Sequence, residues 1–266
     1  MRNRIHLSGS LLLVSAGLVI AGFGNQPASE EEPTPRRTRP DAMADGAVDI
    51  FYCTQSAGFR HPVLPETREI MSKLGEKHDW LRVTVSDDIA DLTPEALERL
   101  DVVMFYTTGE LPMTEEQKSA FVQFCESGGG FVGVHSATDT FYQWPWYVEH
   151  IGGSFNGHPW HEEVGILVDD RAHPSTRHFD GDRFVITDEI YMFKNENPDR
   201  QVLLRLDPES VEDRANGVYP KTSWTRRTGA GPVFYTALGH RSEVWNDERF
   251  IRHLLGGIRW AAGVDE

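Results

Sequence analysis

The sequence predicts an α/β domain built on a doubly wound, mainly parallel sheet. Short apolar runs recur about every 20 to 30 residues, and helical segments lie between them. Runs without polar alternation are typical of strands that are buried on both faces, as in a parallel sheet. Polar residues follow directly after several of the runs, where ligands bind in such sheets. We expect one domain, over residues 47–264.

The first half of this domain predicts a regular alternation of strands and helices. Thr93 and Pro94 are a typical helix start, and Thr114 with Gln117 forms the pattern of a capping box. The predicted strands are the apolar runs at residues 48–53, 81–85, 102–106 and 131–135.

Beyond residue 160 the pattern is less regular. Further strands are expected at residues 164–168, 202–204 and 232–236. The clearest helix of the chain lies at residues 247–262, where apolar side chains recur along one face and Asn246 precedes the first turn. We expect this helix to complete the domain.

The N-terminus predicts export. Arg2 and Arg4 precede an apolar stretch at residues 11–23, and small residues around Phe23 suit a cleavage site. Residues 1–24 are therefore expected to be a signal peptide or an uncleaved anchor, and the protein to be extracytoplasmic (periplasmic or secreted). Residues 25–46 are rich in Pro, Glu, Arg and Ala, which predicts a disordered linker.

The net charge excludes some classes of binding partner, and the positions of the two cysteines predict whether they are bonded. The formal net charge is −15, and the acidic excess lies after residue 46. Such a surface repels phosphate backbones, so we expect no nucleic-acid partner, and membrane contact only through the N-terminal segment. Cys53 and Cys125 fall in a predicted strand and on a predicted helix, and both are expected to be buried free thiols.

Histidines follow three of the predicted strands. His135 and His240 come at or just after a strand, whereas His61 needs its loop to fold back. Each histidine alone could be a structural residue, but three in equivalent places favour a site. Since the carboxyl ends of parallel strands share one edge, we expect these histidines around one cavity, with Glu189 and Tyr191 on its wall.

Several segments also resemble the ThuA-like (trehalose-utilisation) family, in the family's order. They are Gly58–His61, Gly128–Ala137, Gly157–His161, Asp188–Tyr191 and Phe234–His240. The resemblance implies the flavodoxin-like architecture of class I glutamine amidotransferases, and it implies a link to sugar catabolism.

The strand-to-helix elbow of those amidotransferases carries a cysteine in the pattern Gly-x-Cys-x-Gly. Here the corresponding segment is Gly133–Ala137, and His135 stands where the thiol would be. Neither cysteine is near this elbow, which excludes glutamine hydrolysis by a thiolate. Ser136 is one position away from where a serine nucleophile would stand.

We expect catalytic roles for His135, His240 and Glu189. An imidazole at the elbow suits a general base or a neutral metal ligand, and His240 or Glu189 would then stabilise an oxyanion or hold a metal. A divalent ion, zinc or manganese, is the candidate cofactor, with His61, His135 and His240 as candidate ligands. The predicted substrate-binding residues are Arg60, His61, Ser136, Asp139, His158, Trp160, His161 and Tyr191.

The sequence thus predicts a carbohydrate-processing enzyme of sugar catabolism with a small-molecule carbohydrate as substrate. The expected reaction is hydrolysis, elimination or isomerisation of an oxidised (keto) sugar or disaccharide, which makes the protein a hydrolase or lyase. Trp160 is expected to stack on a sugar ring. Two alternatives stay open, a non-catalytic carbohydrate-binding module on the same scaffold and a structural or interaction protein.

Overall fold

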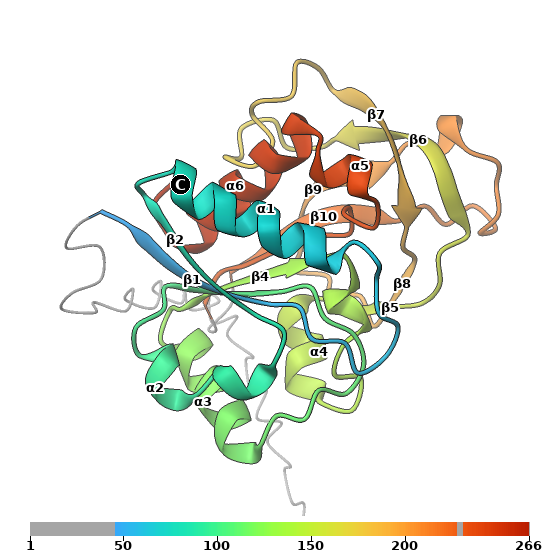
Figure 1. Cartoon of the computed structure of the whole chain (residues 1–266). Helices are drawn as coiled ribbons and strands as arrows, with labels where there is room; N and C mark the ends of the chain where they lie inside the picture. The colour runs from blue at the N-terminus through green and yellow to red at the C-terminus, as the bar shows by residue number, and fades with distance from the viewer. Residues whose placement is uncertain (1–45, 228–230, 266) are drawn as a thin grey trace, which may run out of the picture. The chain divides into compact units, whose positions relative to one another are not determined.

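The computed structural model describes residues 46–227 and 231–265 (Figure 1). The signal segment expected at residues 1–24 and the linker expected at residues 25–46 lie outside the described residues, apart from Gly46. Within the described ranges, every helix is too short or too polar to cross a membrane.

One nine-stranded sheet organises the described chain, in the order β2-β1-β3-β4-β11-β10-β9-β6-β7. A second, two-stranded sheet pairs β5 (Ser154–Phe155) with β8 (Phe193–Lys194). The strands of the large sheet are β1 (Val48–Cys53), β2 (Leu81–Ser86), β3 (Val102–Phe105), β4 (Gly130–Val134), β6 (Trp160–Val168), β7 (Arg183–Ile190), β9 (Gln201–Leu206), β10 (Lys221–Arg226) and β11 (Val233–Thr236).

The first five strands of this order are parallel, as the sequence predicts. β1 pairs with β2 and β3, and β4 pairs with β3 and β11. With β11 as the fifth parallel strand, this is the 2-1-3-4-5 order of flavodoxin-like folds. The four apolar runs of the first half match β1 to β4 to within two residues at each end.

The other four strands extend the sheet by antiparallel pairing, from β10 through β9 and β6 to β7. The runs expected at residues 164–168 and 202–204 fall within β6 and β9, and the run expected at 232–236 begins one residue before β11. Strands β7 and β10 were not predicted from the sequence. Both mix polar with apolar residues, and several of the polar ones, including Asp188, Glu189 and Thr222, are nevertheless buried.

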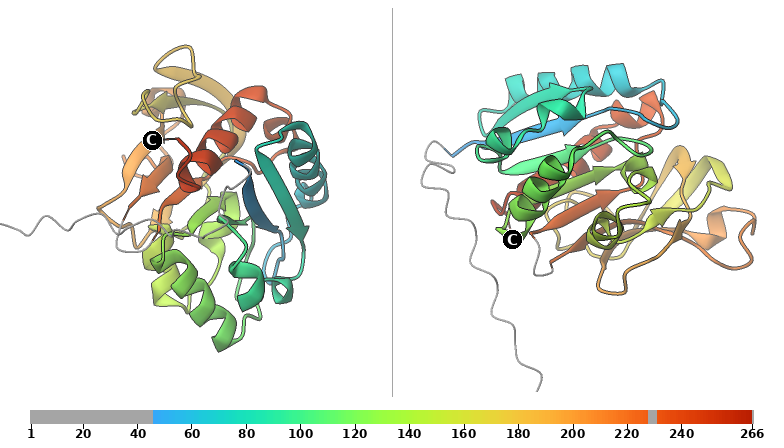
Figure 2. Two further views of the ribbon diagram at one scale, coloured as in Figure 1. Left: turned by 90° about the vertical axis from the view of Figure 1, so that its left-hand side faces the viewer. Right: turned by 90° about the horizontal axis from the view of Figure 1, so that it is seen from below.

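Helices cover both faces of the sheet (Figures 1 and 2). The helices α1 and α6 lie on one face and α2, α3 and α4 on the other. Alternation along β1 matches this, since Ile50 and Tyr52 pack with the first group and Phe51 and Cys53 with the second. The helices are α1 (Leu64–Lys77), α2 (Pro94–Leu97), α3 (Glu115–Glu126), α4 (Pro145–Ile151), α5 (Ser242–Trp245) and α6 (Glu248–Ala261).

Helix boundaries follow the local capping signals. Thr114 and Gln117 form the predicted capping box of α3, and the Thr93 hydroxyl accepts the Ala96 N–H at the start of α2. The final helix begins one residue later than expected. Asp247, not Asn246, caps α6, because its carboxylate accepts the Arg249 N–H.

Candidate active site

The segment after β4 turns sharply at His135. This residue has φ 45°, in the left-handed region that is strained for a residue with a side chain, and a short 3-10 segment, η2 (His135–Asp139), follows it. Two contacts hold the turn. His135 Nδ1 lies 2.6 Å from the carbonyl oxygen of Ala237, and the Tyr235 hydroxyl donates to the His135 carbonyl oxygen at 2.7 Å. The elbow therefore fixes His135 at the carboxyl edge of the sheet.

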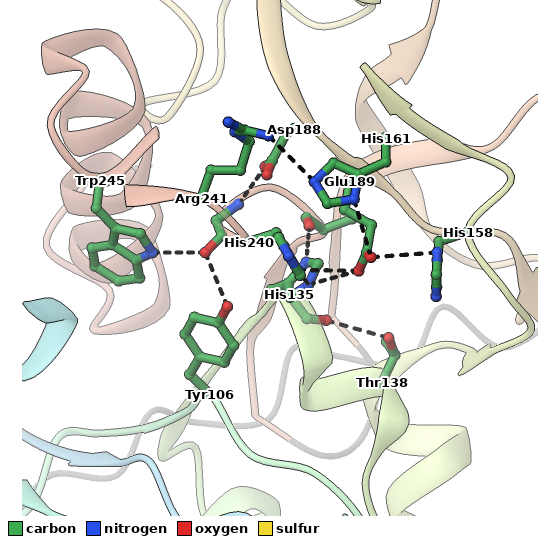
Figure 3. A network of polar contacts seen from close by, with 12 residues as sticks. Tyr106, His135, Thr138, His158, His161, Asp188, Glu189, His240, Arg241 and Trp245 are labelled. Carbon is green, nitrogen blue, oxygen red and sulfur yellow. Dashed lines mark hydrogen bonds and ion pairs between the residues drawn. The ribbon is translucent and has the colours of Figure 1, made fainter. Parts of the chain in front are cut away.

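Four side chains from four parts of the chain converge at this edge, and Figure 3 shows three of them, His135, Glu189 and His240. His61 lies between β1 and α1, His135 at the elbow, Glu189 near the end of β7, and His240 after β11. Glu189 Oε2 lies 3.4 Å from His135 Nε2 and 3.2 Å from His240 Nδ1. The two histidine nitrogens are 3.3 Å apart. We call these four residues the buried cluster.

Glu189 reaches the buried cluster because the antiparallel half of the sheet bends over the parallel half. β7 is at the far end of the strand order, several strands from β4, yet its Glu189 contacts His135. Burial raises the pKa of the Glu189 carboxyl group, but the close contacts with His135 and His240 outweigh burial and hold the pKa well below its usual range. Glu189 is therefore ionised at neutral pH.

The second carboxylate oxygen of Glu189 faces two more histidines. Its Oε1 lies 3.3 Å from His158 Nδ1 and 3.8 Å from His161 Nδ1. The β6–β7 register pairs His161 directly with Glu189. The side chains of His158 and His161 are 49% and 42% exposed, whereas His135 is fully buried. These two residues, the rim histidines, are the part of the site that a ligand can reach first.

His61 completes the buried cluster from the opposite side. Its ring centroid lies 4.9 Å from that of His135 and 5.2 Å from that of His240. Its Nδ1 is buried and has no hydrogen-bond partner among the described residues. Burial, together with His135 and His240, lowers the pKa of His61 to about 3, so the ring is neutral at physiological pH.

The loop that carries His240 is anchored by residues that our sequence analysis missed. The Gly239 N–H donates to Asp188 Oδ2 at 2.7 Å, and the Gly239 carbonyl oxygen accepts the Tyr106 hydroxyl at 3.0 Å and the Trp245 indole N–H at 2.8 Å. Asp188 and Tyr106 interrupt or end otherwise apolar segments. That was the available signal, because a buried polar side chain needs a partner.

Other predicted substrate-binding residues lie around the buried cluster without joining it. Arg60 is exposed in the loop before His61. Ser136 is fully buried, and its Oγ has no partner among the described residues. The Asp139 carboxylate accepts the Tyr142 hydroxyl at 2.5 Å. The Tyr191 ring packs against the His135 ring with centroids 4.2 Å apart, so Tyr191 lines the site next to His135.

The sugar-stacking role expected for Trp160 is wrong. Its side chain is fully buried, its ring packs on Tyr219, and its indole N–H donates to the Glu212 carbonyl oxygen at 2.9 Å. An indole without an exposed face cannot stack on a ligand. One exposed aromatic residue next to the site is Phe59, which is 62% exposed and contacts the His61 ring edge to face at 4.9 Å.

Both cysteines are buried free thiols, as expected. Burial raises the pKa of Cys53 to about 12 and that of Cys125 above its usual range. Neither thiol therefore supplies a nucleophile at neutral pH.

The arrangement supports two kinds of chemistry. Each residue of the buried cluster offers one ligand atom, and these atoms all lie within 4.8 Å of one another, which suits a metal ion. A carboxylate against a half-exposed imidazole, as in Glu189 and His158, suits proton transfer.

Comparisons with known proteins agree with this architecture. The family model of ThuA, described as trehalose utilisation, matches residues 49–261. A putative ThuA-like protein from Bacteroides uniformis is 27% identical with a TM-score of 0.69, over 83% of this chain and 93% of that one. A putative ThuA-like protein from Parabacteroides merdae is 16% identical with a TM-score of 0.66, over 81% and 90% of the two chains. A cytoplasmic protein from Salmonella typhimurium shares the fold at 10% identity, with a TM-score of 0.54 over 80% and 98%. No curated protein matches the chain.

Proposed function

The chain belongs to the ThuA (trehalose utilisation) family, and on this premise we propose that it is an enzyme of sugar catabolism that acts on an oxidised (keto) sugar or disaccharide. The family supports sugar metabolism in general. The observation that carries the specific proposal is the contact between Glu189 and His158, which joins an ionised carboxylate to an imidazole that a substrate can reach.

His158 is the general base of this proposal. Its Nδ1 lies 3.3 Å from Glu189 Oε1, and a carboxylate at this nitrogen favours the tautomer with the hydrogen on Nδ1, which leaves Nε2 with a lone pair that can accept a proton. His135, the base that the elbow first indicates, is fully buried, and its Nε2 is turned toward Glu189 and His240. A substrate carbon therefore cannot approach His135 while these two residues hold their places.

His161 is less suited to the same role. Its Nδ1 is 3.8 Å from Glu189 Oε1, beyond hydrogen-bond distance, and its Nε2 lies 3.4 Å from Arg241 Nη1. Burial, followed by His240, lowers the pKa of His161. A weaker base without an aligned carboxylate partner fits substrate binding better than proton abstraction.

The proposed reaction begins at the carbon between the carbonyl group and the glycosidic carbon. The carbonyl group acidifies this C–H bond, and His158 Nε2 takes the proton while the electron pair forms an enolate. The enolate re-forms the carbonyl group and expels the glycosidic oxygen, which takes a proton as the C–O bond breaks. The products are an unsaturated keto sugar and an alcohol, so this step is an elimination.

The test uses the purified full chain and pairs of disaccharides that differ only by one carbonyl group in place of a hydroxyl group. We expect turnover of keto-disaccharides alone, followed by mass spectrometry. In D₂O, recovered substrate should gain one deuterium at the acidified carbon. His158→Gln should lower both rates by about 10²- to 10⁴-fold, the usual effect of losing a general base.

The matched control is His78→Gln, which replaces a partly exposed histidine at the C-terminal end of α1 and should leave both rates unchanged. Binding of the keto-disaccharide without turnover or deuterium exchange would instead favour the carbohydrate-binding module. No binding of any sugar would rule out the sugar substrate altogether.

A further inference from the structure

The geometry points to a divalent transition-metal site formed by His61, His135, Glu189 and His240, which we propose as the resident cofactor site of this protein. The inference deepens the proposed function by supplying a Lewis acid beside His158. The site is defined by its ligand atoms alone and does not depend on the identity of the substrate.

Three ligand atoms of His135, His240 and Glu189 meet at one point. The contact of His135 Nδ1 with the Ala237 carbonyl oxygen at 2.6 Å places a hydrogen on Nδ1, so Nε2 is the ring nitrogen directed toward the other two residues. This Nε2 lies 3.4 Å from Glu189 Oε2 and 3.3 Å from His240 Nδ1. A cation at the centre of the three atoms would be bound by all of them.

His135 Nε2, His240 Nδ1 and Glu189 Oε2 form a triangle of the size found around a small metal ion. Its edges are 3.2 Å, 3.3 Å and 3.4 Å. Metal–ligand bonds of about 2.0 to 2.1 Å at tetrahedral angles place neighbouring ligand atoms about 3.3 to 3.4 Å apart. His135, His240 and Glu189 are therefore spaced for one small ion without any rearrangement.

His61 brings a fourth ligand within reach of the same ion. Its ring is buried, and its Nδ1 has no hydrogen-bond partner among the described residues. A ring nitrogen of His61 is among the ligand atoms that all lie within 4.8 Å of one another. An ion in the buried cluster could therefore be bound by His61 as well.

The residues around the buried cluster are those that metal sites use to orient their ligands. The Ala237 carbonyl oxygen sets the tautomer of His135, and Glu189 contacts the rim histidine His158 through its second oxygen. Asp188 holds the Gly239 N–H next to His240. His135 and Glu189 thus each have a partner on the side away from the proposed ion, and His240 is held through the backbone of the residue before it.

Three imidazoles and one carboxylate favour a borderline ion, zinc before manganese, over magnesium or calcium, which prefer oxygen ligands alone. Glu189 would connect the ion to His158, because one of its oxygens would bind the ion and the other lies 3.3 Å from His158 Nδ1. The positive charge of the ion would stabilise the enolate oxygen that forms when the proposed substrate loses its proton.

The test measures the metal directly. The purified full chain is stripped with chelator, divided, reloaded with Zn²⁺ or Mn²⁺ alone, desalted and analysed for bound metal. We expect close to one equivalent of zinc and an increase in the melting temperature that chelator reverses. Glu189→Gln preserves the shape of the side chain and should weaken zinc binding at least 100-fold, and His135→Ala and His240→Ala should do the same.

His78→Ala is the control, because it removes a partly exposed imidazole at the C-terminal end of α1 and takes away none of the four ligands. It should retain one equivalent of zinc. Far-UV circular dichroism of every variant separates loss of the ligand from loss of the fold. Less than a tenth of an equivalent of either metal in the reloaded wild type would overturn the inference, as would stoichiometric zinc in Glu189→Gln.

The metal test and the sugar test fail separately. A protein that binds zinc but turns over no keto-disaccharide keeps the metal site and loses the proposed substrate. A protein that turns over the substrate in the presence of chelator and without bound metal keeps the proposed function. In that case His135 and His240 act as a hydrogen-bonded network with Glu189.

Discussion

His135 Nδ1 lies 2.6 Å from the backbone carbonyl oxygen of Ala237, and this contact determines which of the two ring nitrogens is directed toward the buried cluster. A carbonyl oxygen only accepts, so Nδ1 carries a hydrogen and Nε2 is the nitrogen directed toward Glu189 and His240. Because Ala237 follows β11 directly and His135 follows β4, the pairing of these two parallel strands sets the contact. The fold itself therefore selects the tautomer.

The strained backbone of His135 gives a prediction about stability. At φ 45°, glycine is free of strain, whereas alanine, like the native histidine, is strained. Both His135→Gly and His135→Ala remove the imidazole, so they differ mainly in backbone strain. We expect His135→Gly to be the more stable of the two by about 1 kcal/mol, measured by urea denaturation with chelator present.

Ala120 supplies the control, since it lies at an ordinary position inside α3. There the order should reverse, and Ala120→Gly should cost about 1 kcal/mol relative to the wild type. If His135→Ala is as stable as His135→Gly, the elbow carries no strain.

Phe59 is predicted to be the aromatic platform of the substrate site. Its side chain is 62% exposed, and its ring meets His61 edge to face at 4.9 Å. Under the proposed function, Phe59→Ala should raise KM about 10-fold and leave kcat within about twofold, because the residue binds the sugar but moves no proton.

Phe59→Trp is the conservative partner and should keep KM near the wild-type value. Neither substitution should change the free energy of unfolding by more than about 0.5 kcal/mol, since the ring is largely outside the core. A fall in kcat with unchanged KM would show that Phe59 acts on the chemistry rather than on binding.

Asp188 is predicted to position His240 without touching a ligand. Its Oδ2 accepts the Gly239 N–H at 2.7 Å, one residue before His240. Asp188→Ala should weaken zinc binding about 10- to 100-fold, the usual effect of losing an orienting group, and Asp188→Asn should restore most of it because an amide oxygen still accepts.

Asp182→Ala is the comparison for this variant. That carboxylate is exposed and pairs with Arg171 at 3.1 Å on the surface, so its loss should leave zinc affinity unchanged. Equal zinc affinity in Asp188→Ala and the wild type would mean that the loop holds His240 without Asp188.

The parallel half of the fold is predictable from the sequence, because its strands are buried on both faces and read as continuous apolar runs. Val102–Phe105 is such a run and is fully buried. β7 gives no such pattern, since Asp188 and Glu189 are polar and yet buried. Their burial depends on Gly239 and the histidines, which are distant in the sequence.

The candidate site is predictable in part for the same reason. Topology brings the ends of β1, β4 and β11 to one edge, so the positions of His61, His135 and His240 follow from the strand pattern. The roles of the individual residues do not follow from the strand pattern. Only the β6–β7 register shows that Glu189 lies opposite His161, and only tertiary packing shows that Glu189 meets His158, that Trp160 is buried and that Phe59 is exposed.

The buried histidine His150 gives a prediction about pH. It stacks on Trp146 with centroids 4.5 Å apart, and its Nε2 is buried without a partner among the described residues. Burial, and then the nearby Arg226, lowers the pKa of His150 to about 3. In the unfolded chain this histidine returns to about 6.5.

The direction in which stability changes with pH follows from which state of the chain binds the proton. Between about pH 6.5 and pH 3 the unfolded chain holds one more proton at this position than the folded chain, so acidification favours unfolding there. Above pH 6.5 both states are neutral at His150, and its contribution to stability is constant. One such proton contributes a slope of at most about 1.4 kcal/mol per pH unit.

His150→Phe keeps an aromatic ring against Trp146 and removes the titration. We expect its melting temperature to fall less than that of the wild type between pH 6.5 and pH 4.5, and to show the same pH dependence as the wild type between pH 7 and pH 8. His78→Gln, at a partly exposed histidine, should follow the wild-type curve throughout. If His150→Phe follows the wild-type curve in acid as well, His150 takes up its proton without unfolding, and its burial is not what makes the protein sensitive to acid.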